Sequence, residues 1–299
     1  MRLFSWSRLV KPEPPLARRV QELEIITSRL IRLGLAGEYH AAFHGRGLEF
    51  AQVREYQAGD DIRTIDWNVT ARSGVPHVKQ FIEERDLTVI LAVDISSSMN
   101  FGSLDRKKID LASELSAVLA FSAEQNGDRI GLLLFSDAIR EFLPPRRGRV
   151  HVQTLVRTAL LASGRAGGKT RFDRAAEFIS RVTSKRAVLI FISDFLDADF
   201  SDSLRRLSSR HDVIALRIED PRERRFPASG IVTLLDSESG QRFAVDLSRQ
   251  SLARRSAARE RFLTDEFRKL GVDAVALSTA EPYDRTLVKF FRQRIARMS

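Results

Sequence analysis

The sequence predicts an α/β protein built on an open, mainly parallel, doubly wound sheet. Two observations carry this prediction. Continuous apolar runs of strand length, such as residues 87–93 and 187–192, are typical of strands buried on both faces. These runs alternate with segments whose apolar residues recur at helical spacing, and such alternation favours a parallel sheet covered by helices on both sides. We also expect an N-terminal extension and a β-hairpin insertion.

The N-terminal part departs from this regular pattern. Residues 16–36 have apolar residues at roughly helical spacing, and Gly34 or Gly37 would end that helix. Residues 45–73 are charged and punctuated by glycine, which favours loops with short strands or turns. We therefore divide the chain into an N-terminal extension (1–85), the main α/β domain (86–280) and a C-terminal helix (281–299).

The elements of the main domain follow from apolar runs and helical stripes. Strands are expected at 87–93, 129–135, 139–143, 187–192, 212–218 and 272–277. Helices are expected at 106–125, 149–162, 172–183, 200–209, 249–270 and 284–295. Residues 231–247 predict a hairpin, because two short apolar runs flank Ser-Glu-Ser-Gly.

Composition excludes several classes of protein. The chain has 299 residues and no cysteine, so disulfides, thiolate nucleophiles and cysteine metal sites are absent. The five histidines are scattered along the chain, and only His40 and His44 stand at i, i+4, so we do not expect a histidine metal site. The longest strongly apolar runs have six or seven residues, whereas a spanning helix needs about 20. We find no signal-peptide pattern and expect a soluble, cytoplasmic protein.

The formal net charge of +10 is concentrated at the two ends of the chain. Residues 249–299 carry an excess of six positive charges and residues 1–33 an excess of four. Such an excess suits nucleic acid or an acidic partner. No nucleic-acid-binding motif accompanies it, so we interpret it as solvated helix faces and keep nucleic-acid binding as an alternative.

A ligand-binding site is expected just after the strands, because ligand sites of open α/β sheets lie at the carboxyl ends of the strands. Asp94, Ser96 and Ser98 form D-x-S-x-S directly after the first buried strand. Thr170 and Asp194 lie in or after loops beside the same sheet. Carboxylate and hydroxyl oxygens are hard donors of the kind that Mg²⁺ prefers. The sequence thus predicts a Mg²⁺ site, which Mn²⁺ could also fill.

This pattern resembles the metal-ion-dependent adhesion site of von Willebrand factor A domains. Asp94, Ser96 and Ser98 match its first motif, Thr170 its loop threonine and Asp194 its last aspartate. The resemblance implies that the first and fourth strands of the domain lie side by side. It also implies that one coordination position stays open for an acidic residue of a partner protein.

A second resemblance covers about residues 46–277. The stretch GRGLEFAQVREYQAGDDIRTIDWNVTARSG, followed by VDISSSMNFG, looks like the bacterial domain of unknown function 58 family. Members are commonly encoded beside MoxR-type AAA+ ATPases, which implies a role as an adaptor for such an ATPase. Within this stretch, residues 59–67 either form a partner surface or, as we expect, an ion-pair and turn network that fixes the N-terminal segment against the sheet.

Two enzyme classes compete with this interpretation. Residues 163–170 resemble a phosphate-binding loop, G-x-x-x-x-G-K-[ST], with Ser163 in place of the first glycine. A helix rather than a strand is expected before them, which argues against a nucleotide hydrolase. Phosphoryl transfer through Asp94 lacks an acid two residues later, where Ser96 stands. We therefore predict a non-catalytic, cation-dependent protein-binding adaptor. A metal-independent scaffold remains an alternative.

Overall fold

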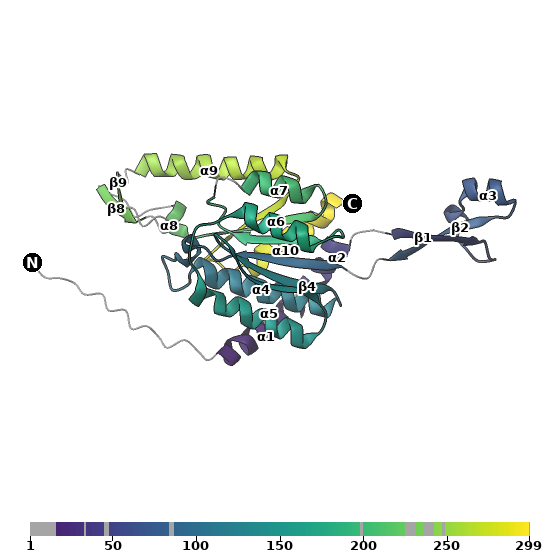
Figure 1. Ribbon diagram of the computed structural model, residues 1–299, viewed down its shortest axis with the longest axis horizontal. Coiled ribbons are helices and arrows are strands. Elements are labelled where there is room, and N and C mark those ends of the chain that lie inside the picture. Colours follow the sequence, from purple (N-terminus) through teal and green to yellow (C-terminus); the bar gives the residue numbers. More distant parts are fainter. Residues whose placement is uncertain are drawn as a thin grey trace, which may run out of the picture.

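A six-stranded sheet forms the centre of the protein (Figure 1). The structure is a computed structural model that describes residues 16–32, 34–44, 48–83, 87–197, 200–224, 231–235, 242–246 and 249–298. The strands are β3 (Thr88–Asp94), β4 (Arg129–Phe135), β5 (Ile139–Arg146), β6 (Val188–Ser193), β7 (Asp212–Glu219) and β10 (Asp273–Ser278). Each begins within one residue of its predicted position, so the strand predictions are confirmed.

The strand order is β10-β7-β6-β3-β4-β5, and only β5 runs antiparallel to its neighbour. Strand β3 lies between β4 and β6, with Leu91 opposite Leu132 on one side and Ile190 on the other. The first and fourth strands of the predicted domain are therefore neighbours, as the resemblance to von Willebrand factor A domains implied.

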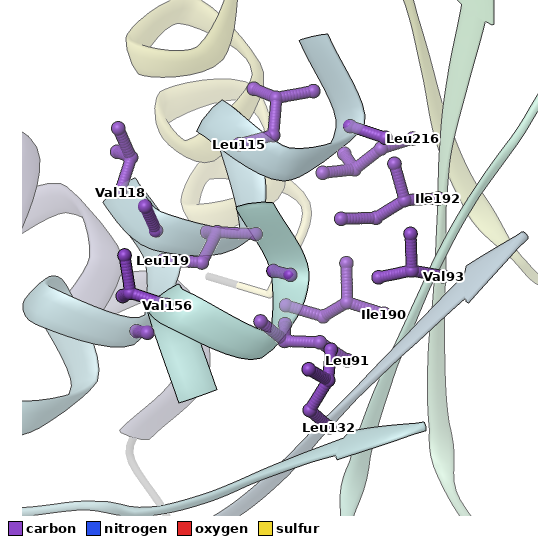
Figure 2. Close-up of a cluster of buried hydrophobic side chains, with 14 of the residues drawn as sticks. Leu91, Val93, Leu115, Val118, Leu119, Leu132, Val156, Ile190, Ile192 and Leu216 are labelled. Atoms are coloured by element: carbon purple, nitrogen blue, oxygen red, sulfur yellow. The ribbon is translucent and has the colours of Figure 1, made fainter. Parts of the chain in front are cut away.

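Helices cover both faces of the sheet. On one face lie α1 (Leu16–Arg32), α2 (Leu35–His44), α4 (Lys108–Gln125), α5 (Arg149–Leu161) and α10 (Asp284–Met298). Figure 2 shows apolar side chains of the strands meeting those of α4 and α5. On the other face lie α6 (Phe172–Val182), α7 (Phe200–Ser208) and α9 (Arg249–Lys269), whose core is rich in phenylalanine. The predicted doubly wound architecture is confirmed.

The N-terminal and C-terminal helices belong to the same hydrophobic core as α4. Tyr39 and Phe43 of α2 pack on Phe291 of α10, with ring centroids 6.1 and 5.4 Å away. The predicted helix from residue 16 is confirmed as α1, and it ends before Gly34, one of the two glycines expected to stop it, where φ is +101°. The second helix, α2, was not predicted. The division of the chain at residues 85 and 280 stays a prediction.

Residues 48–83 form an arm that projects from the body in Figure 1. It consists of strands β1 (Leu48–Glu55) and β2 (His77–Glu83), paired antiparallel, with the short helices η1 (Ile62–Thr64) and α3 (Trp67–Ser73) between them. The sequence predicted loops with short strands here, and the strands are longer than expected. Polar residues close the turns: Arg54 pairs with Asp60 at 2.6 Å.

The acidic residues of the arm stabilise the arm itself. Asp61 accepts a hydrogen bond from the Arg63 backbone at the start of η1, and Asp66 caps α3. The predicted ion-pair and turn network at residues 59–67 is thus present. Its predicted position against the sheet is wrong, because these bonds are made within the arm. Trp67 remains 70% exposed.

The remaining elements complete the carboxyl edge of the sheet and its surroundings. Helix α8 (Pro221–Arg224) follows β7, while η2 (Ser97–Asn100) and η3 (Ala162–Arg165) follow β3 and α5. The predicted hairpin is confirmed as β8 (Ile231–Leu235) paired antiparallel with β9 (Arg242–Asp246). None of the helices in the described part of the chain combines the length and apolar content that a membrane span requires.

Arg294 fastens α10 to the sheet. Its side chain is only 5% exposed and pairs with Asp212 of β7 and Asp273 of β10. Its Nε also donates to the Ala42 carbonyl oxygen at 3.0 Å, which ties α2 to α10. One buried guanidinium therefore holds two strands and two helices together.

Replacing Arg294 with methionine is expected to lower the free energy of unfolding by about 3 kcal/mol, because two carboxylates lose their buried partner. Urea unfolding followed by circular dichroism measures this. Arg297 is the matched control, since it also pairs with Asp273 but is 70% exposed, so Arg297→Met should cost less than about 1 kcal/mol. Equal losses in the two variants would contradict the assigned role of Arg294.

Candidate functional site

The candidate site lies at the carboxyl edge of the sheet, where β3 and β6 end side by side. Asp94 is the last residue of β3, and Asp194 follows the last residue of β6. The strands are parallel, with Val93 opposite Ile192. Parallel pairing therefore brings the two carboxylates to the same edge although they are far apart in the sequence.

Backbone hydrogen bonds hold the loop after β3 against the loop that carries Thr170. The Ser97 N–H donates to the Gly168 carbonyl oxygen at 2.9 Å, and the Gly167 N–H donates to the Ile95 carbonyl oxygen at 2.8 Å. Because these bonds run in both directions, the two loops form one unit. Thr170 is thereby fixed beside the end of β3.

Gly168 is favoured at its position chiefly by its backbone conformation. Its φ is +82°, which other residues adopt only with strain. A Cβ at this position would also lie 2.6 Å from an Asp137 carboxylate oxygen. The tight passage of the chain at Gly168 thus sets the direction in which Thr170 leaves the loop.

Asp94 is fully buried and accepts three hydrogen bonds. Its Oδ1 accepts from the Ser96 backbone N–H at 2.8 Å. Its Oδ2 accepts from the Ser193 hydroxyl at 2.7 Å and from the Thr170 hydroxyl at 3.4 Å. The carboxylate therefore gathers one backbone donor and two hydroxyls from three separate segments of the chain.

The hydroxyl oxygens have the spacing of a hard-cation site. Ser96 Oγ and Ser98 Oγ are 3.1 Å apart. In an octahedron with ligands about 2.1 Å from Mg²⁺, neighbouring oxygens lie about 3.0 Å apart. The Ser96–Ser98 spacing is close to that edge length. The donor set of Ser96, Ser98, Thr170 and the two aspartates suits Mg²⁺ in its chemistry, and the Ser96–Ser98 pair also has a suitable spacing.

Asp194 has partners of its own. Its Oδ2 accepts from the Lys108 ammonium at 2.6 Å, and its Oδ1 accepts from the Leu196 backbone N–H at 3.2 Å. Lys108 also contacts Glu223 Oε1 at 2.6 Å. The second carboxylate of the site is therefore paired with a lysine inside the protein.

Burial and a neighbouring negative charge dominate the electrostatics of Asp94. Burial, together with the negative charge of Asp194, raises the pKa of Asp94 to about 7. Hydrogen bonds from Ser193 and Ser96 oppose this rise. A bound divalent cation acts in the opposite direction, since it favours the ionised carboxylate.

The structure brings all five predicted residues to this edge and buries them. Asp94 and Ser96 are fully buried, and Ser98, Thr170 and Asp194 are each at most 5% exposed. Within the described part of the chain, no group of three or more His, Asp or Glu side chains forms a metal-ligand cluster. Any ion here would therefore depend on hydroxyls as much as on carboxylates, and cation binding stays a prediction.

Three residues of this edge were missed as members of a site. These are Ser193 at the end of β6, Lys108 in α4 and Glu223 in α8, none of which belongs to the predicted ligand set. Lys108 carries a signal that could have found it, because a cation in the first turn of a helix opposes the helix dipole. A lysine at such a place needs a carboxylate partner. Glu223 carries no comparable signal.

The phosphate-loop interpretation of residues 163–170 does not match the fold. Helix α5 and η3 precede this segment, whereas a phosphate loop leaves a strand before it enters a helix. The lysine and threonine of the motif, Lys169 and Thr170, instead lie in the loop that is bonded to the end of β3. The predicted helix before the motif is confirmed.

The sheet order and the hydroxyl-rich edge define an α/β protein that resembles von Willebrand factor A domains. A family model described as "Protein of unknown function DUF58" matches residues 52–265. The uncharacterized protein Rv1480 of Mycobacterium tuberculosis is 34% identical over 287 residues, which cover 94% of this chain and 90% of that protein. The chain therefore belongs to the DUF58 family.

Two solved structures are also similar to this chain. A conserved hypothetical protein, BatB from Bacteroides thetaiotaomicron, shares 17% identity over 71% of this chain and 98% of that chain, with a TM-score of 0.45. A von Willebrand factor type A protein from Catenulispora acidiphila shares 15% identity over 74% of this chain and 44% of that chain, with a TM-score of 0.38.

Proposed function

We propose that this chain is a non-catalytic adaptor that binds protein partners through a divalent cation. One observation carries the proposal: two carboxylates and three hydroxyls from three loops gather, buried, at the carboxyl edge of the sheet. Such a donor set suits Mg²⁺ or Mn²⁺. A fold of this type supports protein interaction in general, and the cation dependence is the specific part of the proposal.

Each residue has a distinct task in this proposal. Ser96, Ser98 and Thr170 offer hydroxyl oxygens to the ion, while Asp94 and Asp194 supply negative charge and orient water. When bound, the cation supplies one open position that takes an acidic side chain of the partner. Because the ligand set contains only two carboxylates, positive charge remains on the ion to attract that side chain.

The partner proposed is a MoxR-type AAA+ ATPase, in the cytoplasm. This part rests on the resemblance that the sequence shows to a family commonly encoded beside such ATPases. The basic ends of the chain add long-range attraction to an acidic partner surface. They act on the rate of encounter and decline with salt, whereas the cation-bridged contact does not share that salt dependence.

A capture experiment tests the proposal. The full chain is immobilised and presented with a purified MoxR-type ATPase from the same organism, in Mg²⁺ or in EDTA. We expect EDTA and Asp94→Ala each to reduce capture by about tenfold or more, since a hydrogen-bonded charged contact is worth a few kcal/mol. Asp202→Ala is the control, because Asp202 is exposed and pairs only with Arg205 among the contacts described.

Capture that persists in EDTA and in Asp94→Ala would contradict the cation-bridged mechanism. It would favour instead the alternative of a scaffold that binds its partner without an ion.

A further inference from the structure

Lys108 is a fully buried lysine at the edge of the candidate site. Its ammonium lies 2.6 Å from Asp194 Oδ2 and 2.6 Å from Glu223 Oε1. The Lys108 and Asp194 side chains are 0% and 2% exposed, while Glu223 is 29% exposed. A buried ammonium is unfavourable unless it is paired, so these two carboxylates account for its presence.

The ion pair is built from three separate parts of the fold. Lys108 is the first residue of α4, Asp194 follows β6, and Glu223 belongs to α8 after β7. Lys108 thus reaches from one helix to the ends of two neighbouring strands. Its place in the first turn of α4 opposes the helix dipole, so the two carboxylates also compensate that repulsion.

A backbone hydrogen bond holds the Glu223 carboxylate in position. Its Oε2 accepts from the Asp220 backbone N–H at 3.0 Å, which leaves Oε1 for Lys108. Asp220 in turn is fixed by the Ser103 backbone N–H and the Thr279 hydroxyl. The geometry therefore fixes how the ammonium is shared between Asp194 and Glu223.

Carboxylates outnumber cations among the charged groups described at this edge. Asp94, Asp194 and Glu223 bring three carboxylates, and Lys108 brings one cation. Arg259 of α9 brings a second, since it interacts with both Asp194 and Glu223 and donates to the Phe195 carbonyl oxygen. Lys108 is the cation in direct contact with a predicted metal ligand.

We propose that Lys108 is a built-in competitor that sets the affinity of the site for divalent cations, and that Glu223 weakens this competition by sharing the ammonium. The inference rests on the proposed cation site. A divalent ion and the ammonium both need the negative charge of Asp194. Removing Lys108 therefore strengthens cation binding, while removing the charge of Glu223 leaves Lys108 more fully on Asp194 and weakens it.

Isothermal titration calorimetry of the full chain with MnCl₂ tests this inference through two changes of opposite sign. Lys108→Met should bind Mn²⁺ about tenfold or more tightly than the wild type, and Glu223→Gln several-fold more weakly, as expected for charges within a few ångströms. Lys107→Met is the matched control. Lys107 is the exposed neighbour of Lys108, so its loss should leave the Mn²⁺ affinity within about twofold.

The outcomes separate this inference from the proposed function. Lys108→Met could bind Mn²⁺ while the wild type does not, and the Asp94→Ala, Lys108→Met double variant could lose that binding. This result supports the competitor role and contradicts a cation-dependent function of the wild type. The inference is overturned if Lys108→Met binds Mn²⁺ no more tightly than the wild type, or if Glu223→Gln binds it more tightly. This holds even where EDTA abolishes partner capture, a result that would support the proposed function. If Lys108→Met does not fold, Lys108→Gln, which keeps a polar group between Asp194 and Glu223, makes the same comparison.

Discussion

Replacing Asp94 with asparagine is expected to stabilise the metal-free protein at pH 8 by up to about 4 kcal/mol. The cause is the raised pKa of Asp94, about 7, which reflects burial and the nearby Asp194. The folded state therefore holds a proton that the unfolded state, with a pKa near 3.9, has already released. As pH rises from about 4 to about 7, ionisation of the Asp94 carboxyl lowers the free energy of unfolding. Asparagine cannot ionise, so the variant does not lose this stability.

Urea unfolding at pH 5 and pH 8, in EDTA, measures the effect as a difference between wild type and variant. Asparagine keeps the shape of the side chain, and the neighbouring hydroxyls of Ser193 and Thr170 can accept from its amide. Asp137→Asn is the control, because the pKa of Asp137 is lowered by its bond from Ser136 and should give the opposite trend. Identical pH dependence in wild type and Asp94→Asn would contradict the prediction.

Manganese should stabilise the wild type but not Asp94→Asn, and so narrow the difference in stability between them. A cation that binds only the folded wild type adds stability that grows with its concentration, by about 2.7 kcal/mol at a hundredfold excess over Kd. Asp94→Asn lacks the charge that holds the ion and should show no such gain. The same urea experiment in MnCl₂ measures this, and an equal gain in both proteins would place the ion elsewhere.

Replacing Phe172 with alanine is expected to cost about 3–5 kcal/mol of stability. Phe172 is fully buried at the start of α6. Its ring centroid lies 5.2 Å from that of Phe195 and 5.4 Å from that of Phe135, in a cluster that also includes Phe191 and Phe200. The alanine leaves a cavity that the surrounding rings fill only in part.

The same change should also weaken Mn²⁺ binding, because Phe172 lies two residues after Thr170 and stacks on Phe195, which follows Asp194. Leu132→Ala is the matched control. Leu132 is fully buried in the other core, where Figure 2 places it beside Leu91, and its loss should cost about 2–5 kcal/mol. Calorimetry under folding conditions should find Mn²⁺ affinity reduced in Phe172→Ala and kept in Leu132→Ala. Equal Mn²⁺ affinities in the two variants would show that the aromatic cluster does not support the cation site.

The sequence was most informative where burial alone decides structure. Strands such as β3 and β6 are apolar throughout because both of their faces are covered, so their positions could be predicted closely. The site positions followed from the same signal, since parallel strands end at one edge. Placing Asp94 beside Asp194 also needed the strand order, which the resemblance to von Willebrand factor A domains implied and the pairing of β3 with β6 confirms.

Tertiary contacts decided what the sequence could not. Helix α2 has no strong helical stripe, and its position depends on Tyr39 and Phe43 packing against α10, far along the chain. The pairing of Lys108 with Glu223 likewise joins α4 to α8. Contacts between distant segments have no local signature, which is why these features appeared only in the structure.

The arm and the candidate site lie at opposite ends of one strand. The arm (residues 48–83) precedes the amino end of β3, and Asp94 closes its carboxyl end, seven residues and roughly 20 Å away. A partner bound at the candidate site therefore leaves the arm, roughly 20 Å away along β3, uncovered.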